Sequence, residues 1–272
     1  MINTEEIMEL SLKLAALKEI PEDSAIYVGG NNIRKVLFCI DAGAPELLLA
    51  KQQGYDAVIA HHPVGGTAVT NFHQVFKRHI QQMVSADIPK EEAEKAVEKK
   101  LEQLKLDEHT RNYNHLVDVA RLLKMPYMNI HTPLDEVGRN IVSKQVQSEL
   151  KKSSKVRDVV SSLYKLAEFK NALTKIEIRL GKPENPAGKV AVSHGAGTNG
   201  GYEIAKTYFT HGIGTVIYIH ISPIDLEKLR ANGVGNLIVT GHIASDSVGI
   251  NPFIRELEKK DVKVTTIGVV PS

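Results

Sequence analysis

The sequence of 272 residues has no tryptophan, 5% aromatic residues and one cysteine, Cys39. Proteins that bind nucleic acid stack bases on aromatic rings and present a clustered basic face, so a formal net charge of +2 gives no case for that partner. A single cysteine forms no disulfide within the chain, which suits a reducing cytosol. No apolar run approaches the roughly 18 residues of a membrane-spanning helix, and the acidic N-terminal segment differs from a signal peptide. We therefore expect a cytoplasmic protein with neither a membrane nor a nucleic-acid partner.

Histidine, by contrast, recurs at one kind of position. Five apolar, strand-like runs each end on histidine, and a sixth run, VLFCI, ends on Asp41. The carboxyl ends of parallel strands lie along one edge of an open α/β sheet, where sites are built. This pattern predicts a metal-dependent site at the strand ends. The histidines concerned are His61 with His62, His131, His194, His220 and His242.

The order of apolar runs and helical patterns predicts an α/β protein. A strand at 34–40, a helix at 44–53 and a strand at 56–60 have the spacing of a βαβ unit. The last third alternates in the same way, which indicates mostly parallel strands. Its predicted strands are 190–193, 215–219, 236–240 and 262–267, and its predicted helices are 202–210, 222–231 and 245–260. Between these parts, the pattern is helical from about residue 72 to 124, and its charged segment 89–115 predicts a solvated helix or helical hairpin, which could also pack against another subunit. A turn that begins at Pro133 leads into a predicted helix at 139–152, and a further helix is predicted at 156–169.

Three short motifs carry residues that bind metals. His61 and His62 are adjacent in an extended segment, so they would face two different ions, unless the bend at Pro63 turns both inward; a surface or core pair is the alternative. Asp135 would supply an oxygen ligand or cap a helix. His242 and Asp246 are four residues apart, on one face of a helix. Together, three histidines and two carboxylates form a nitrogen and oxygen donor set suited to a dinuclear Zn, Mn or Fe site that activates water.

The motifs AHHPVGG, HTPLDEVGRNI and GHIASD, in this order, resemble those of the NIF-three-like family, whose bacterial members are labelled GTP cyclohydrolase 1 type 2 homologs. The resemblance implies a NIF-three-like fold of two α/β lobes around a metal-binding cleft and a ring-shaped homo-oligomer. The first lobe would comprise 1–132 plus 236–272 and carry most metal ligands, and the second would comprise 133–235. The ligands would be His61, His62, Asp135, His242 and Asp246. The family commonly has Glu at the last position, so a bridging role is less secure for the shorter Asp246.

Other residues at strand ends have supporting roles in this interpretation. Asp41 would orient a ligand histidine, contact substrate or only cap a helix, and His131 would line the site or make a structural hydrogen bond. His194 and His220 are expected to be structural or to contact substrate. The remaining five histidines are expected to be structural: His73, His79, His109, His115 and His211.

The segment from Gly195 through Gly197 to Gly200 matches the pattern G-x-G-x-x-G between a predicted strand and a predicted helix. It favours a tight turn, an anion loop for a phosphate or carboxylate of the substrate, or a dinucleotide fingerprint. The next strand ends on His220, where a dinucleotide site would have an acidic residue. An NAD-dependent oxidoreductase is therefore the least favoured of three functions.

The favoured function is a metal-dependent hydrolase with two divalent ions, acting on a nucleotide-like or phosphorylated small molecule. One ion would bind His62, Asp135 and Asp246, and the other His61, His242 and Asp246. The alternative is a non-catalytic metal-binding scaffold or regulatory interaction protein. The sequence does not specify the substrate.

Overall fold

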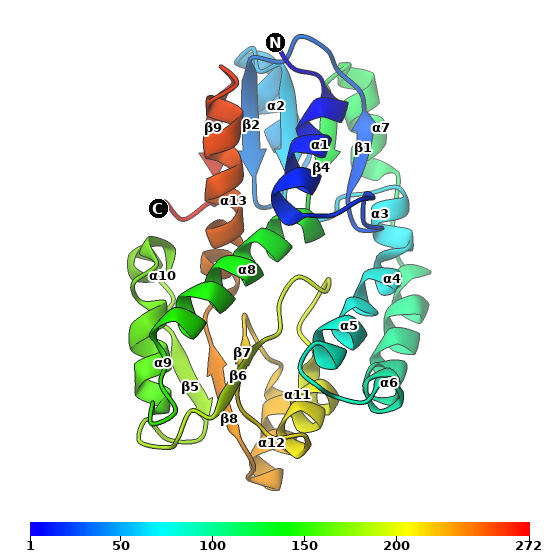
Figure 1. The fold of residues 1–272 in the computed structure, drawn as a ribbon. Coiled ribbons are helices and arrows are strands. Elements are labelled where there is room, and N and C mark those ends of the chain that lie inside the picture. The colour runs from blue at the N-terminus through cyan, green and yellow to red at the C-terminus, as the bar shows by residue number, and fades with distance from the viewer. The chain divides into compact units, whose positions relative to one another are not determined.

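A computed structural model describes residues 1–272, which divide into two compact units (Figure 1). Unit 1 comprises Met1–Val75, Glu102–Val137 and Gly249–Val269, and unit 2 comprises Phe76–Leu101, Gly138–Val248 and Val270–Ser272. The predicted lobes differ from these units. Strand β8 (Asn236–Val239), assigned to the first lobe, instead pairs with two strands of the second sheet, because its buried apolar side chains belong to the core of unit 2.

Unit 1 is built on a five-stranded sheet. Its strand order is β1 (Ala25–Val28), β4 (Tyr127–Asn129), β3 (Ala57–Ala60), β2 (Lys35–Cys39) and β9 (Lys263–Ile267). Only β1 is antiparallel to its neighbour, and the other pairs are parallel. The strand β3 is buried throughout and β2 nearly so, as expected for parallel strands covered on both faces. This sheet brings the ends of β3 and β4 side by side.

Helices α2 (Ala44–Gln52) and α7 (His115–Leu123) cover one face of this sheet. Leu47 and Ala120 from these helices join a buried cluster with Leu37, Val58 and Tyr127 from the strands. Helix α1 (Thr4–Ala15) begins with a capping box in which the Asn3 side chain accepts from the backbone N–H of Glu6. This core packs β2, β3 and β4 against the two helices and so fixes the strand ends that the candidate site residues follow.

Four helices lie between β3 and α7 in the sequence, as the helical pattern predicted. They are α3 (Thr67–Thr70), α4 (Phe72–Phe76), α5 (Arg78–Val84) and α6 (Lys90–Glu108). Helix α6 carries the charged run and buries only Ala93, Ala96 and Val97. Its other side chains are partly or fully exposed, so the predicted solvated helix is confirmed.

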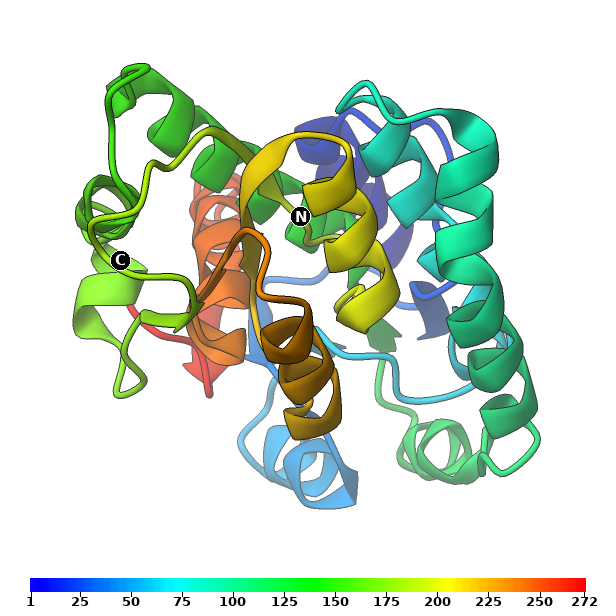
Figure 2. The same ribbon diagram turned by 90° about the horizontal axis from the view of Figure 1, so that it is seen from below.

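Unit 2 is built on a four-stranded sheet. Its strand order is β5 (Glu177–Leu180), β8, β7 (Ile213–Tyr218) and β6 (Lys189–Val192), and only β5 runs antiparallel. One face packs against helices α9 (Val156–Leu163) and α10 (Ala167–Asn171) through a cluster that includes Val159, Phe169 and Ile238. Helices α11 (Gly201–Thr210) and α12 (Pro223–Asn232) contact each other, and Figure 2 shows them side by side. The predicted α/β class with mostly parallel strands is confirmed.

Two helix starts and one break differ from the predictions. Helix α8 (Thr132–Glu149) begins before Pro133 rather than near residue 139, because proline is tolerated in the first turn, where no N–H is needed. Helix α13 (His242–Glu258) likewise begins at His242 instead of 245. The helix predicted at 156–169 is interrupted because Leu166 has an extended backbone. Strand β1, which we did not predict, is a short edge strand.

The helices of the structure include none with the length and apolar character needed to span a membrane.

Candidate metal centre

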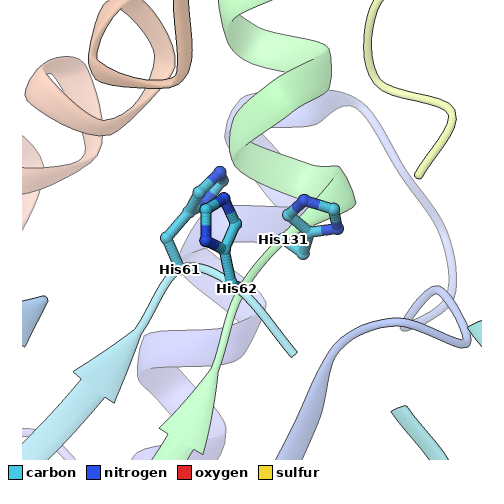
Figure 3. A group of neighbouring side chains, drawn as sticks. All are labelled: His61, His62 and His131. Carbon is cyan, nitrogen blue, oxygen red and sulfur yellow. The ribbon is translucent and has the colours of Figure 1, made fainter. Parts of the chain in front are cut away.

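Three imidazoles gather at one end of the unit 1 sheet. His61 and His62 follow β3, and His131 follows β4, whose Asn129 is paired with Ala60 of β3. The ring centroids of His61 lie 5.1 Å from His62 and 4.9 Å from His131. One nitrogen of each ring lies within 4.8 Å of the others, so this group could hold a metal ion (Figure 3).

Nδ1 of His61 and of His131 faces a group that can only accept a hydrogen bond. Nδ1 of His61 lies 3.0 Å from the carbonyl oxygen of Ile130, and Nδ1 of His131 lies 2.7 Å from Oδ2 of Asp23. Each Nδ1 must therefore carry the proton, and in a neutral ring Nε2 then holds the lone pair. Metal-ligating histidines are usually held in this way by a carbonyl or carboxylate.

His62 has the same arrangement with Asp41, the residue that follows the VLFCI run. Nδ1 of His62 lies 2.7 Å from Oδ1 of Asp41, so Nδ1–H donates and Nε2 again holds the lone pair in the neutral ring. The Asp41 side chain is 80% exposed, in contrast to the fully buried Asp23. Water therefore competes for the Asp41 carboxylate, and its hold on the ring is weaker.

Asp135, in the first turn of α8, lies between two of these rings. Its Oδ1 is 3.2 Å from Nε2 of His61, and its Oδ2 is 3.6 Å from Nε2 of His131. Two ring lone pairs and a carboxylate thus converge in a buried space, where they repel one another unless a cation or added protons lie among them. A nitrogen and oxygen donor set of this kind suits a divalent transition metal.

Asp23 is the residue of this site that the sequence reasoning missed. Oδ2 of this carboxylate also accepts from the Thr132 hydroxyl at 2.7 Å, while the Ser24 hydroxyl accepts from the backbone N–H of His131 at 3.0 Å. The turn at 21–24 gave no signal of a strand end, and only the antiparallel pairing of β1 with β4 brings Asp23 to His131.

Unit 1 contains a cavity of about 190 Å³ whose lining includes two neighbours of these histidines. Pro63, which lines it, directly follows His62, and the ring of Phe72, which also lines it, stacks on His131 at 6.1 Å. Apolar Val69 and Leu104 form further parts of its wall. The charged side chains at the cavity are Asp107, Glu108 and Arg111.

Unit 2 places three further histidines after parallel strands: His194 after β6, His220 after β7 and His242 after β8. The rings of His220 and His242 lie 5.0 Å apart. His242 and Asp246 share one face of α13, with Nε2 of His242 3.4 Å from Oδ2 of the buried Asp246. The predicted pair at i and i+4 is thus formed within the helix.

His220 is held by Asn199, a residue of the glycine loop that the sequence reasoning did not single out. Nδ2 of Asn199 lies 2.9 Å from Nδ1 of His220. Burial lowers the pKa of His220, and the neighbouring His242 lowers it further. Both effects favour the neutral ring.

The loop of Gly195, Gly197 and Gly200 joins β6 to α11 and is fixed by helix α5. Gly195 and Gly197 have φ values of 70° and 78°, a backbone region that favours glycine. Side chains of α5 bind three of the loop's carbonyl oxygens. The donors are Gln82 to His194 at 2.5 Å, Arg78 to Gly195 at 2.9 Å and His79 to Thr198 at 2.9 Å.

The remaining five histidines are not part of the two histidine and aspartate groups described above. Nε2–H of His79 donates to Thr198, and its Nδ1 lies 3.3 Å from the Ser193 hydroxyl. Complete burial lowers the pKa of His79 to about 4. His73 pairs with Glu108 at 2.7 Å. Three are exposed on the surface: His109, His115 and His211.

These observations define an α/β protein whose strand ends carry histidine and aspartate groups that could hold metal ions. The family model described as Duf34/NIF3 (NGG1p interacting factor 3) matches residues 5–271. The chain therefore belongs to the Duf34/NIF3 family, and the family resemblance inferred from the three motifs is confirmed.

Solved structures agree with this assignment. A NIF3 superfamily protein from Sphaerobacter thermophilus is 47% identical, with a TM-score of 0.96 and 98% of each chain covered. Reduced HcgD from Methanocaldococcus jannaschii is 14% identical, with a TM-score of 0.59 and coverage of 97% of this chain and 98% of that one. A hypothetical protein from Staphylococcus aureus is 14% identical, with a TM-score of 0.54 and coverage of 98% and 97%. The last two show similarity of fold alone. Comparison with curated proteins finds no match.

Proposed function

We propose that this protein binds two divalent metal ions and is a metal-dependent hydrolase of a nucleotide-like or phosphorylated small molecule. The observation that carries the proposal is the convergence of ring lone pairs and the Asp135 carboxylate in unit 1. The ligands we propose are His61, His62, Asp135, His242 and Asp246, with Zn, Mn or Fe as the metals that such a donor set favours.

Two helices that carry proposed ligands pass from one unit into the other along the chain. Asp135 lies in the first turn of α8, a helix that continues into unit 2 after Val137. His242 and Asp246 lie in the first turns of α13, which continues into unit 1 after Val248. One ion would bind His62, Asp135 and Asp246, and the other His61, His242 and Asp246. His131 is a further candidate ligand, because its Nδ1 faces the Asp23 carboxylate, an arrangement typical of metal-ligating histidines.

Two divalent ions held by these residues would supply Lewis acidity and an activated water for hydrolysis. The residues around them have separate tasks. Asp23, Asp41 and the carbonyl of Ile130 hold protons on the Nδ1 atoms and so orient the Nε2 lone pairs. The cavity lined by Pro63 and Phe72 would receive part of the substrate, with Asp107, Glu108 and Arg111 as its charged groups. The glycine loop offers backbone N–H groups to an anion.

Turnover by the metal-loaded protein tests this proposal. A panel of phosphomonoesters, phosphodiesters and nucleotides should include a substrate that the protein hydrolyses faster than free metal does. The His61→Ala/His242→Ala variant, which removes one proposed ligand from each unit, should show no such turnover.

The family description names an interacting factor, which favours a scaffold as the second candidate. A scaffold would bind metal and hydrolyse nothing on the panel above the rate of free metal. Bound metal without turnover would therefore replace the hydrolase with the scaffold, whereas absence of metal binding would contradict both.

A further inference from the structure

We propose that Asn199 fixes His220 with its proton on Nε2, and that this N–H binds an oxyanion of the substrate beside His242. The role rests on the proposed function, because the oxyanion would be part of the substrate of that centre. The inference adds three things to the proposed function: the group that binds the substrate, the residue that fixes the proton of this group, and the class of ligand that the group recognises.

The orientation of the Asn199 amide follows from a backbone donor. The N–H of Gly201 lies 3.0 Å from Oδ1 of Asn199, and a backbone nitrogen can only donate. The acceptor must therefore be the amide oxygen, which places the amide nitrogen at the other end of the group. That nitrogen, Nδ2, faces Nδ1 of His220 at 2.9 Å and carries only donor hydrogens.

Nδ1 of His220 must consequently accept, so it carries no proton. The neutral ring then has its proton on Nε2, where it is a donor. Nδ1 is the only atom of the His220 side chain with a hydrogen bond to another protein group. The Nε2–H of this half-buried ring is therefore free to bind a ligand next to His242.

This is the reverse of the arrangement at the proposed metal ligands of unit 1. His61 and His62 donate from Nδ1 to acceptors, which leaves a lone pair on Nε2 in the neutral ring. His220 accepts at Nδ1, which leaves a hydrogen on Nε2. A lone pair suits a cation, whereas an N–H suits an oxygen with negative charge. The partner of Nδ1 therefore distinguishes two kinds of histidine. His61 and His62 present a lone pair that suits a metal ion, and His220 presents a hydrogen that suits an anion.

The glycine loop that carries Asn199 supplies further donors. No backbone N–H from Gly195 to Gly200 has an acceptor in the protein. Because the carbonyls of His194, Gly195 and Thr198 are bound to α5, the N–H groups in the same planar peptides face away from that helix. These belong to Gly195, Ala196 and Asn199. A phosphate or carboxylate is the class of ligand that such N–H groups and the Nε2–H of His220 would recognise.

The proton position can be measured directly on the metal-free, full-length protein with nitrogen-15-labelled histidine. Long-range proton–nitrogen spectra at about pH 8, where an ordinary histidine is neutral, distinguish the protonated ring nitrogen. The signals of His220 are identified by their loss in His220→Gln. We expect a protonated Nε2 and an unprotonated Nδ1. In Asn199→Asp the new carboxylate should draw the proton onto Nδ1. A protonated Nδ1 in the native protein, or an unchanged pattern in Asn199→Asp, would overturn the proposal.

Inorganic phosphate is the probe for the ligand role, again on the metal-free protein. Phosphate should shift the Nε2 signal of His220, and His220→Phe should weaken phosphate binding by about tenfold, equivalent to about 1.4 kcal/mol. His220→Gln places an amide N–H near the position of Nε2 and should keep most of the binding. Equal binding by the native protein and His220→Phe, or no binding by the native protein, would contradict the ligand role. Because no metal is present, these results are independent of whether the proposed hydrolase activity is found.

Discussion

Oδ2 of Asp23 lies 2.7 Å from Nδ1 of His131, although the two residues are 108 positions apart in the sequence. Asp23 is fully buried, and its carboxylate accepts hydrogen bonds from the Ser24 hydroxyl, from the His131 ring and from both the backbone N–H and the hydroxyl of Thr132. The carboxylate therefore fixes both the proton and the plane of the His131 ring. This pairing is typical of metal-ligating histidines, which makes His131 and Asp23 part of the account of the metal centre.

Replacing Asp23 tests this relationship. In Asp23→Asn an NH₂ group would face donors that the carboxylate accepts from, so the His131 ring should lose its orientation. We expect metal affinity to fall by about 10- to 100-fold in a chelator competition. The matched control is Asp56→Asn, because Asp56 accepts from two backbone N–H groups of Arg34 and Lys35 in the same unit. That variant should lose stability but keep its metal affinity. Unchanged affinity in Asp23→Asn would exclude His131 as a ligand.

Asp246 is tested by shortening and by lengthening its side chain. Asp246→Ala should lose at least one metal ion per chain while the fold survives, since it removes the proposed shared carboxylate. Asp246→Glu keeps the carboxylate on a side chain that is one methylene longer, and it should retain both ions. Metal content by plasma mass spectrometry and far-ultraviolet circular dichroism measure the two effects. If Asp246→Ala keeps the native stoichiometry, Asp246 is not a ligand.

Burial of His79 makes stability depend on pH. Its pKa is about 4 in the folded protein and about 6.5 when unfolded, so the unfolded chain binds more protons between these values. The contribution of neutral His79 is complete above about pH 6.5 and is lost as the pH falls toward 4, by up to about 3 kcal/mol. Urea unfolding of the metal-free protein at several pH values measures this loss. His79→Gln keeps a donor for Thr198 and should have a shallower pH dependence. If the free energy of unfolding falls equally with pH in both proteins, the loss does not come from His79.

The glycine loop is tested at Gly197. Valine is strained at a φ of 78°, so Gly197→Val should distort the loop and weaken phosphate binding without changing metal content. Gly212→Val is the matched control, because Gly212 has a φ of 82° and no other atom lies within 4 Å of a Cβ added there. It introduces similar strain away from the loop and should keep phosphate binding. Loss of metal in Gly197→Val alone would show that the loop supports the metal site instead.

Local sequence pattern predicted the parts of the fold that depend on apolar periodicity. The strands β2, β3, β7 and β8 and the helices between them were found within a few residues, because their buried runs are continuous. The antiparallel strand β1 was missed because its four residues are only half-buried. The start of α8 was placed too late, since Pro133 was taken to indicate a turn although it is also compatible with a first helical turn.

The candidate site was predictable where residues follow strands and not where they come from turns. His61, His62 and Asp135 lie together in unit 1, as do His242 and Asp246 in unit 2, in keeping with their positions at strand ends and on one helix face. Asp23 lies in a turn, and its partner His131 is 108 positions away in the sequence. Asn199 lies in a loop, and its contact with His220 depends on how the amide is oriented. No local pattern specifies such pairings, and only the folded structure reveals which nitrogen of each histidine carries the proton.

Metal stoichiometry is the most direct test of the central claim. Untagged protein purified without chelators should contain about two transition-metal ions per chain by plasma mass spectrometry, and His61→Ala/His242→Ala, which removes two ligands of the same proposed ion, should contain about one. That result would establish the centre and identify its metal. Absence of metal from the native protein, even after reconstitution with Zn, Mn or Fe, would contradict the account and make the histidines at the strand ends structural.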